Sequence, residues 1–199
     1  DLILLLHFDN LSEYGENGTR YHDFSPLGIE AQCTNNTCPV LEQEGKFGSA
    51  ITLNASVGGI NCSNEAERQP SAFTVAAWIR TTHAYSANPL ISWAPAGIAY
   101  PAVYLPWGGT GPMIYMGYSD PHSNYRTFSW PLNLYNGDWH HVVFTLAGNG
   151  TADINTGRFF VDGNEYQAKT TNANTPMHVK QNCFVGASHG DLVSWNGTI

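Results

Sequence analysis

Two pairs of glutamates, Glu42 with Glu44 and Glu65 with Glu67, have a spacing that could support acid–base chemistry. In an extended strand, side chains two residues apart lie on the same face, so each pair would bring two carboxylates together. Two carboxylates can hydrolyse a glycosidic bond, one as the acid and the other as the base or nucleophile. Both pairs, however, lie in polar segments that favour loops. We interpret them as solvated surface charge and predict that the protein is not an enzyme.

The adjacent histidines His140 and His141 resemble a metal-binding pair. They lie in an alternating segment typical of a strand, where consecutive side chains point to opposite faces, so they cannot chelate one ion. We expect both to have packing roles. The sequence also lacks a glycine-rich phosphate loop and a His-Glu-x-x-His motif. We therefore expect no required cofactor.

The four cysteines, Cys33, Cys38, Cys62 and Cys183, form an even set that allows three connectivities. The segment between Cys33 and Cys38 is typical of a small closed loop, which leaves Cys62 to pair with Cys183. The second bridge would close a loop of about 120 residues and contribute on the order of 4 kcal/mol in the chain-entropy model. A zinc site is the alternative, but no Cys-x-x-Cys or histidine-rich spacing supports it. The cysteines therefore favour two disulfides.

The composition limits the possible partners. Charged residues are only 12% of the chain and the formal net charge is −8. Nucleic acids and anionic membranes attract clustered cations, so this balance argues against both. The sequence contains no run of eighteen apolar residues, which is about the length that a membrane-spanning helix needs. The apolar residues 2–6 are too few for a signal-peptide core, and we expect them to begin a mature protein whose leader has been removed.

Potential glycosylation sites offer another source of solubility. The chain contains seven Asn-x-Ser/Thr triplets, whereas a chain of this composition would have roughly two or three by chance. The excess favours a secreted, heavily N-glycosylated protein. The alternative is that loops rich in Asn and Thr produce the triplets by chance. Asn61 is the least certain acceptor, because Cys62 lies inside its triplet. The acceptor asparagines are Asn10, Asn17, Asn35, Asn54, Asn61, Asn149 and Asn196.

Strand-like runs separated by Gly, Pro and Asn predict a single all-β domain over residues 1–199. A dozen short strands at this spacing indicate an antiparallel two-sheet jelly-roll sandwich with negligible helix. We expect Trp78, Trp139, Val143 and Phe159 to be largely buried inside it, so Trp139→Ala should cost about 3–5 kcal/mol. The clearest predicted strands are 2–8, 47–53, 73–81, 90–93, 102–105, 113–118, 127–130, 139–146, 158–161, 183–187 and 195–199.

Several motifs resemble those of laminin G-like and pentraxin-like domains in the concanavalin A-like lectin/glucanase superfamily. The segment from Asn136 to Gly163 resembles the Trp-His-His-Val strand of that family and its aromatic-Val-Asp-Gly hairpin. Further matching pieces are Leu5-Leu6-His7-Phe8-Asp9, Asp23-Phe24-Ser25-Pro26-Leu27-Gly28, Gly45-Lys46-Phe47-Gly48-Ser49-Ala50-Ile51-Thr52-Leu53, Phe73-Thr74-Val75-Ala76-Ala77-Trp78-Ile79, Phe184-Val185-Gly186 and Trp195-Asn196-Gly197-Thr198-Ile199.

The resemblance implies a jelly roll and adds three expectations. Glucanases of this superfamily carry a Glu-x-Asp-x-Glu run, which this sequence lacks. In the resembling family an Ile-Asp-Glu-x-x-Ile-Tyr strand continues from the last Gly-x-Ile, so the chain is expected to lack the final strand. Calcium is the metal such domains often hold. Its candidate ligands here are Asp120, Asn124 and Asp191, although their spacing alone does not define a site.

Two functional hypotheses follow. The first is a structural or adhesive module that works by association, and the second is a lectin-type module that binds glycans, with or without calcium. Exposed aromatic side chains stack on sugars and also anchor protein interfaces, so they do not separate the two hypotheses. A glycan array with and without a chelator would separate them, because a lectin should show a defined sugar preference. The candidate ligand or interface residues are Trp107, Tyr118, Tyr125 and Trp130.

The N-terminal run suggests how such a module could assemble. In the resembling family the terminal strand lies beside the first strand, so a chain that ends at Ile199 leaves that first strand with an unpaired edge. Such an edge is a template for another chain, and a neighbouring copy could add a strand head-to-tail and build a filament. The alternative to such assembly is that the last strand belongs to a longer chain. The predicted assembly edge comprises Leu2, Ile3, Leu4, Leu5 and Leu6.

Overall fold

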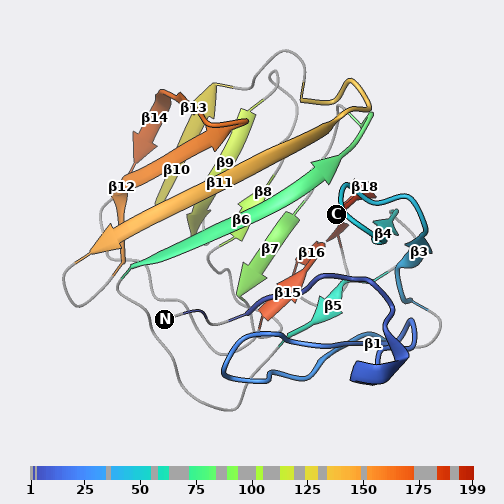
Figure 1. Cartoon of the computed structure of the whole chain (residues 1–199). Helices are drawn as coiled ribbons and strands as arrows, with labels where there is room; N and C mark the ends of the chain where they lie inside the picture. The colour runs from blue at the N-terminus through green and yellow to red at the C-terminus, as the bar shows by residue number, and fades with distance from the viewer. Residues whose placement is uncertain are drawn as a thin grey trace.

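The computed structural model describes residues 2, 4–34, 37–54, 58–62, 72–83, 89–93, 102–104, 113–118, 124–129, 134–148, 152–172, 183–188 and 193–199. Over these residues the regular secondary structure is β-strand apart from one 3-10 turn, η1 (Ser12–Tyr14). Two antiparallel sheets pack against each other (Figure 1). The two-sheet sandwich predicted from the sequence is confirmed.

The first sheet has seven strands and contains the longest ones. Its hairpin from β12 to β13 turns at Asp162 and Gly163, whose φ angles of 49° and 81° are both left-handed, as a two-residue type I′ turn requires. In order across the sheet, its strands are β13 (Asn164–Tyr166), β12 (Ala152–Val161), β11 (Trp139–Gly148), β6 (Phe73–Arg80), β18 (Gly197–Thr198), β4 (Ala50–Leu53) and β3 (Val40–Glu42).

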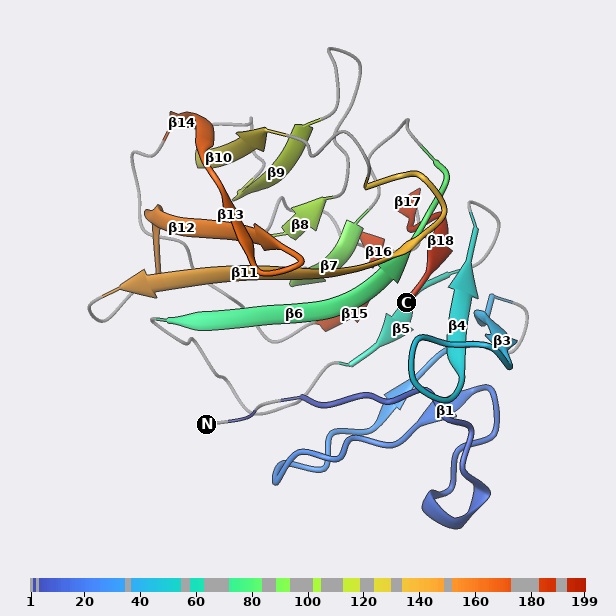
Figure 2. The same ribbon diagram turned by 45° about the horizontal axis from the view of Figure 1, so that its top comes forward.

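The second sheet has nine strands, the longest of which has 6 residues, and it faces the first sheet across the core (Figure 2). A separate ladder pairs β16 (Ala187–Ser188) with β17 (Val193–Ser194). The strands of the nine-stranded sheet, in order, are β1 (Arg20–Tyr21), β2 (Ala31–Gln32), β5 (Ile60–Asn61), β15 (Cys183–Val185), β7 (Pro89–Trp93), β8 (Ala102–Tyr104), β9 (Met113–Tyr118), β10 (Asn124–Ser129) and β14 (Ala168–Asn172).

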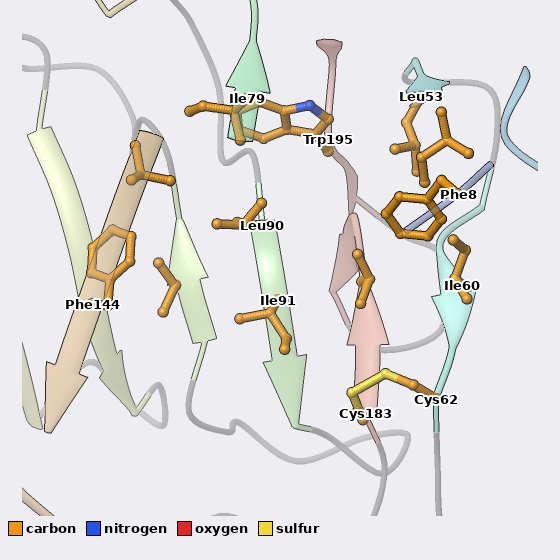
Figure 3. Close-up of a cluster of buried hydrophobic side chains, with 14 of the residues drawn as sticks. Phe8, Leu53, Ile60, Cys62, Ile79, Leu90, Ile91, Phe144, Cys183 and Trp195 are labelled. Carbon is orange, nitrogen blue, oxygen red and sulfur yellow. A yellow bond between two sulfur atoms is a disulfide. The ribbon is translucent and has the colours of Figure 1, made fainter. Parts of the chain in front are cut away.

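The core lies between the sheets and draws alternate side chains from each strand. Figure 3 shows Ile79 and Phe144 of the seven-stranded sheet beside Leu90 and Ile91 of the nine-stranded sheet. Phe159 on β12 is fully buried and stacks on Phe144 with ring centroids 4.6 Å apart. The predicted burial of Phe159 is confirmed. Burial of such apolar side chains supplies the main driving force for folding.

Three other residues expected in the core lie on the outer face of the seven-stranded sheet. Val142 and Phe144 on β11 are fully buried, so the alternate positions Trp139 and Val143 point outward and are half-buried. Trp78 on β6 is half-buried as well and pairs with His141. The predicted burial of Trp78, Trp139 and Val143 is therefore wrong. Trp139→Ala is therefore not expected to cost 3–5 kcal/mol, since removing a side chain from the outer face leaves no cavity in the core.

The predicted first strand does not form. Residues 2 and 4–8 are in no strand, and Ile3 lies outside the described residues. The segment ends at Phe8, whose φ of 61° is incompatible with a continuing strand. Leu4 and Leu6 pack partly against the core, whereas Leu2 and Leu5 are 50% and 36% exposed. An apolar run on both faces could not reveal that this segment is held by contacts other than strand pairing.

A buried carboxylate fixes the N-terminal segment to the domain. The Asp23 carboxylate accepts hydrogen bonds from the backbone N–H of Leu5 at 2.9 Å, from the N–H and hydroxyl of Ser25 at 2.8 and 2.7 Å, and from the N–H of Ile29 at 2.7 Å. The Leu5 carbonyl in turn accepts the N–H of Phe24 at 2.9 Å. Burial alone would raise the pKa of the Asp23 carboxyl, but these hydrogen bonds outweigh it and lower the pKa.

This carboxylate makes stability depend on acid pH. Because the folded-state pKa of Asp23 is lowered, its contribution is present above the unfolded pKa of about 3.9 and is lost as the pH falls through the folded value. We expect Asp23→Asn to lower the free energy of unfolding by about 2–3 kcal/mol at neutral pH, with a smaller difference from wild type below the folded pKa. Urea titrations at several pH values measure this, with the exposed Glu13→Gln as control. A deficit that does not change with pH would contradict it.

Candidate functional site

Strand β6 is paired along its whole length on one side only. All eight of its residues pair with β11. On its other side, β18 pairs with β6 at Thr198 and Arg80 alone, and within the described part of the chain no strand pairs with residues 74–79 there. In Figures 1 and 2 the N-terminal segment lies on this second side. We call it the open side of β6.

The backbone bonds of the neighbouring strands show which groups face the open side. The N–H of Asp162 donates to the His141 carbonyl, so the main-chain groups of His141 point to β12 rather than to β6. Main-chain groups alternate in direction along a strand. The odd-numbered residues of β6 therefore bond to β11, and the N–H and C=O groups of Thr74, Ala76 and Trp78 point to the open side.

The C-terminal strand agrees with this assignment. The N–H groups of Ile51 and Ile199 each donate to the carbonyl of the other, at 3.0 and 2.9 Å, so Ile199 faces β4. The preceding residue, Thr198, must then face β6, where Arg80 is its partner. Arg80 is even-numbered, like Thr74, Ala76 and Trp78. Its main-chain groups are thus satisfied by β18, whereas no described residue bonds to the main-chain groups of those three on this side.

Burial of the core-facing side chains falls where β18 ends. Ile79, next to β18, is fully buried, whereas Val75 and Ala77 on the same face of β6 are only half-buried. The described apolar side chains Leu4, Leu6 and Ile199 are also only partly buried against the same core. The open side therefore combines main-chain hydrogen-bonding groups with a partly covered apolar floor.

The outer face of β6 and β11 carries a second feature, which we call the aromatic–cation patch. It comprises Lys46, Phe47, Trp78, Arg80, Trp139 and His141. The Lys46 ammonium lies 4.7 Å from the Trp78 ring centroid, and the Arg80 guanidinium lies 5.0 Å from that of Trp139. Phe47 meets Trp78 edge-on with centroids 5.7 Å apart and is 71% exposed. The patch therefore presents aromatic rings and two cations on one surface.

The two histidines separate as the strand period predicts. His141 lies on the outer face, 5.1 Å from Trp78 between ring centroids. His140 Nδ1 lies 2.7 Å from the Asp162 carboxylate, which also accepts the His141 N–H at 2.9 Å. Burial alone would raise the pKa of the Asp162 carboxyl, but these bonds outweigh it and lower the pKa. Within the described residues no group of three or more His, Cys, Asp or Glu could hold a metal ion.

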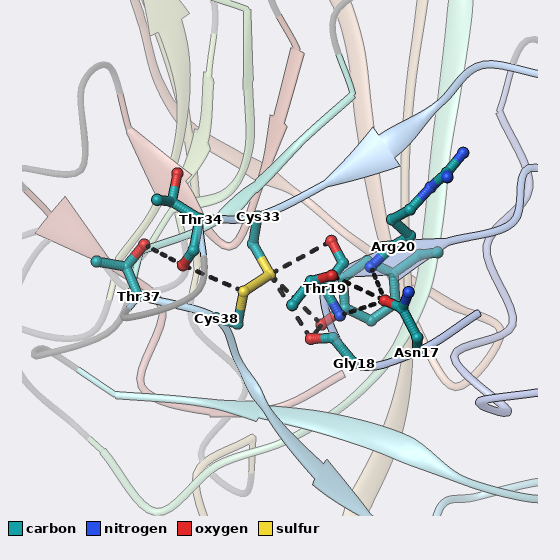
Figure 4. The surroundings of a disulfide bond; sticks show 9 residues. Asn17, Gly18, Thr19, Arg20, Cys33, Thr34, Thr37 and Cys38 are labelled. Atoms are coloured by element: carbon teal, nitrogen blue, oxygen red, sulfur yellow. Dashed lines mark hydrogen bonds between the residues drawn. A yellow bond between two sulfur atoms is a disulfide. The ribbon is translucent and has the colours of Figure 1, made fainter. Parts of the chain in front are cut away.

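Both predicted disulfides are confirmed. Cys62 and Cys183 link β5 to the neighbouring β15 in the nine-stranded sheet, as Figure 3 shows. Cys33 and Cys38 close a short loop. In Figure 4 this loop lies against Gly18 and Thr19, whose carbonyls are 3.7 and 3.6 Å from the Cys33 sulfur.

The sequon asparagines that the structure describes are at or near the surface. Asn10, Asn17, Asn54 and Asn61 are exposed, and Asn196 is half-buried. The Asn17 side-chain oxygen accepts hydrogen bonds from the N–H and hydroxyl of Thr19, the third residue of its own triplet, at 3.1 and 2.7 Å (Figure 4). Asn35 and Asn149 lie outside the described residues. Glycan attachment remains a prediction at all seven positions.

Most of the predicted ligand residues lie outside the described residues, and for the others the structure describes the backbone only. Trp107, Trp130, Asp120 and Asp191 are outside the described residues, as are Glu65 and Glu67. The backbone of Tyr118 at the end of β9 pairs with Asn124 at the start of β10, where Tyr125 follows. Glu42 lies in β3 and accepts the Thr52 hydroxyl at 3.0 Å, whereas Glu44 is exposed beyond it. No described contact joins these residues into one site.

Sequence reasoning missed both the open side and the aromatic–cation patch. The two-residue period places Trp78 with Arg80, and Trp139 with His141, but both faces of β6 and β11 are apolar enough to be the inner one. The only sequence signal for the patch was the position of two basic residues, Lys46 and Arg80, next to aromatic residues. Among the described residues, no helix is long and apolar enough to cross a membrane.

Comparison with known proteins places this geometry in a family. A laminin G family model, described as the concanavalin A-like lectin/glucanases superfamily, matches residues 54–199. A search of curated proteins gave no significant match. Domain 4 of AbnA, an extracellular GH43 arabinanase from Geobacillus stearothermophilus, was solved in complex with arabinotriose. It is similar in structure with a TM-score of 0.59 and 18% identity, over 91% of this chain and 87% of that one.

Two further solved structures are more distant. Domains LG4-5 of the mouse laminin α1 chain give a TM-score of 0.49 at 18% identity, over 71% of this chain and 37% of that one. Trypanosoma rangeli sialidase in complex with the inhibitor DANA gives 0.49 at 13% identity, over 93% and 28%. The likeness to the arabinanase domain shows the fold, and the family model covers most of the chain. The protein therefore belongs to the laminin G-like family of the concanavalin A-like lectin/glucanases superfamily.

Proposed function

We propose that this protein is a non-catalytic association module that accepts an extended polypeptide strand along the open side of β6. The observation that carries the proposal is the one-sided pairing of β6, where the main-chain groups of Thr74, Ala76 and Trp78 have no described partner. Unpaired N–H and C=O groups in a row are a template for strand addition. Each backbone hydrogen bond formed contributes about 0.5–1.5 kcal/mol net.

The core beside the open side supports the same partner. A strand that runs antiparallel to β6 would place alternate side chains over Val75 and Ala77, which are half-buried. Burying apolar surface contributes roughly 25 cal/mol per Å². The preferred partner therefore has apolar residues at alternate positions. A second copy of this chain is the simplest source, and a head-to-tail contact whose rotation does not close would build a filament.

The setting that we propose is extracellular, with the protein secreted as an N-glycoprotein. Two disulfides suit an oxidising compartment, and the exposed sequon asparagines are accessible to modification. The low charge content of 12% gives attached glycans a role in solubility. Mass spectrometry before and after glycosidase treatment tests this setting, since a secreted N-glycoprotein loses mass at the modified asparagines.

Strand addition can be tested with a synthetic peptide of about eight residues, a usual strand length, that alternates apolar and polar side chains. We expect it to bind, because its apolar face covers the core beside Val75 while its backbone pairs with β6. The control peptide has the same composition with its apolar pattern interrupted, so that no register places its apolar residues together on the core face. Fluorescence anisotropy measures both affinities. Equal binding of the two peptides would contradict the proposal.

A variant of β6 localises the interaction. Ala76→Pro removes an N–H that points to the open side and leaves the β11 bonds of the adjacent odd-numbered residues in place, as for a proline at a sheet edge. We expect the variant to fold but to bind the alternating peptide at least about tenfold more weakly. An unchanged far-UV circular dichroism spectrum verifies folding. Unchanged peptide affinity in the folded variant would argue against pairing at this position.

Carbohydrate binding is the second candidate function. It is favoured by the aromatic–cation patch, because exposed aromatic rings stack on sugar faces. The similar arabinanase domain was solved with arabinotriose, which makes a glycan ligand a reasonable candidate for this chain too. A glycan array with and without a chelator tests it, and a defined sugar preference is the expected result.

A further inference from the structure

We propose that Asn17-Gly18 is the preferred site of intramolecular deamidation in this protein, at which an Asn17 without a glycan converts to aspartate or isoaspartate. Gly18 has no side chain that would obstruct attack of its own nitrogen on the Asn17 side chain. The pair directly precedes Thr19 and β1 in the nine-stranded sheet. It is therefore independent of strand addition at β6 and of carbohydrate binding at the aromatic–cation patch.

Three hydrogen-bond donors surround the side-chain oxygen of Asn17. The Thr19 hydroxyl donates to Oδ1 at 2.7 Å, and the N–H groups of Thr19 and Arg20 each donate to it at 3.1 Å (Figure 4). This oxygen gains negative charge when a nucleophile adds to the Cγ carbon, and hydrogen bonds to a charged acceptor are stronger than those to a neutral one. The three donors therefore stabilise the tetrahedral intermediate more than the ground state, as the donors of an oxyanion hole do.

The main-chain nitrogen of Gly18 is the nucleophile. Within the described part of the chain no group accepts its N–H, so no hydrogen bond has to break before it attacks. The space around Gly18 is open, since a Cβ atom built there would meet nothing within 4 Å. Asn17 is exposed, which lets solvent take the proton of the Gly18 N–H.

The reaction needs only water. The deprotonated Gly18 nitrogen forms a bond to Cγ of Asn17, the Cγ–Nδ2 bond breaks, and Nδ2 takes up a proton and leaves as ammonia. The product is a five-membered succinimide, which water opens at either carbonyl to give aspartate or isoaspartate. One water is consumed, one ammonia is released and nothing is oxidised. Either product carries a new negative charge and lacks the amide nitrogen to which an N-glycan would attach.

The other two described Asn-Gly pairs lack this combination. Asn196-Gly197-Thr198 repeats the Asn-Gly-Thr triplet of the proposed site. Gly197, however, pairs with Leu53 of β4, and a Cβ atom built on it would lie 2.6 Å from the Arg80 carbonyl oxygen. The main chain there is fixed in a strand and tightly packed, which opposes the rotation that ring closure needs.

The Asn136-Gly137 pair differs at its nucleophile. The Gly137 N–H donates to the Thr81 carbonyl at 3.2 Å, so the nitrogen is already engaged. The Asn136 side-chain oxygen accepts the N–H of Asp138 at 2.8 Å and lies 3.2 Å from Nε2 of His140. A free nucleophile together with three donors on the amide oxygen therefore distinguishes the first pair from both of the others.

The test follows the protein produced without N-glycans and with both disulfides intact, incubated at neutral pH in isotopically labelled water. Label enters an asparagine position when a succinimide opens during the incubation, and peptide mass spectrometry reads it at each position. In the folded protein we expect Asn17 to deamidate at least about tenfold faster than Asn196. In urea the two identical triplets should react at similar rates, because the hydrogen bonds and the strand pairing that distinguish them are lost.

Two variants test the role of the donors. Thr19→Val removes the hydroxyl donor and keeps both N–H donors, so it should slow deamidation of Asn17 at least about tenfold and leave the rate at Asn136 unchanged. Thr34→Val is the matched control, because it removes an exposed hydroxyl from the neighbouring Cys33 loop, and it should leave both rates unchanged.

Equal rates at Asn17 and Asn196 in the folded protein would overturn the proposal. An unchanged rate in Thr19→Val, or equal slowing by Thr34→Val, would also overturn it, since the donors on the amide oxygen would then not set the rate. Should Thr19→Val fail to fold, the comparison of the two identical triplets in the unmodified sequence still decides the question.

Discussion

Replacing Cys62 and Cys183 together by alanine is expected to lower the free energy of unfolding by about 4–5 kcal/mol in the chain-entropy model. The two cysteines are 121 residues apart in sequence, so their bond removes a large part of the conformational freedom of the unfolded chain. Both side chains are buried, and alanine leaves no new polar group in the core. Urea denaturation followed by tryptophan fluorescence measures the loss.

The second disulfide is the matched control for this prediction. Cys33 and Cys38 are only 5 residues apart, so the same model expects their replacement by alanine to cost about 2 kcal/mol. The difference between the two double variants tests the role of loop length. Equal losses for both, or a smaller loss for Cys62 and Cys183, would contradict the prediction.

Truncating Phe159 to alanine is expected to cost about 3–5 kcal/mol. Its side chain is fully buried and stacks on Phe144, and its ring lies 5.9 Å from Tyr166. Alanine would leave a cavity between the two sheets because β11 and β13 fix the position of β12. Thermal and urea denaturation give the change in stability.

The adjacent Phe160 provides the control, because it lies on the opposite face of the same strand. It is half-buried and lies under the Arg158 guanidinium, 4.8 Å from the ring centroid. Phe160→Ala should therefore cost about 1 kcal/mol or less. A larger loss for Phe160→Ala than for Phe159→Ala would show that the inner face of β12 had been assigned wrongly.

Much of the fold could be predicted because strong local signals agree with the tertiary structure. The alternation predicts a strand at residues 73–81, and the structure contains one from Phe73 to Arg80. The Asp162-Gly163 dipeptide predicts a tight hairpin, and both residues adopt positive φ. The sequence also predicts β11 from Trp139 onward. Period, turn chemistry and cysteine spacing are local properties, so one sequence suffices to show them.

Other features depend on contacts between distant segments. Trp78 and Trp139 lie on the outer face because Ile79 and Val142 occupy the inner one, and aromatic residues on both faces of a strand do not reveal this choice. The predicted strand at residues 47–53 begins only at Ala50, because Gly48 adopts a left-handed φ of 68° that interrupts an extended strand. The sequence predicts the next strand only at residues 158–161. Instead β12 begins at Ala152, and the Thr156 hydroxyl bonds to the main chain of Ala147.

The candidate surfaces were the least predictable part. The assembly edge was expected at Leu2 to Leu6 because of their apolar run, but the Asp23 carboxylate and the Phe24 N–H hold the main chain of Leu5. The unpaired main-chain groups belong instead to β6, whose sequence is typical of any interior strand. Strand neighbours are set by the register of the whole sheet, so the open side becomes visible only when β18 is placed beside Arg80.

Residue-resolved amide hydrogen exchange along β6 tests the central claim most directly. In the free protein, the account predicts fast exchange for the amides of Thr74, Ala76 and Trp78 and slow exchange for those of Val75, Ala77 and Ile79, which bond to β11. Adding the alternating peptide should slow the first three and leave the others slow. Uniformly slow exchange along β6 in the free monomer would contradict the account, because the main-chain groups on its second side would then already be satisfied within the chain.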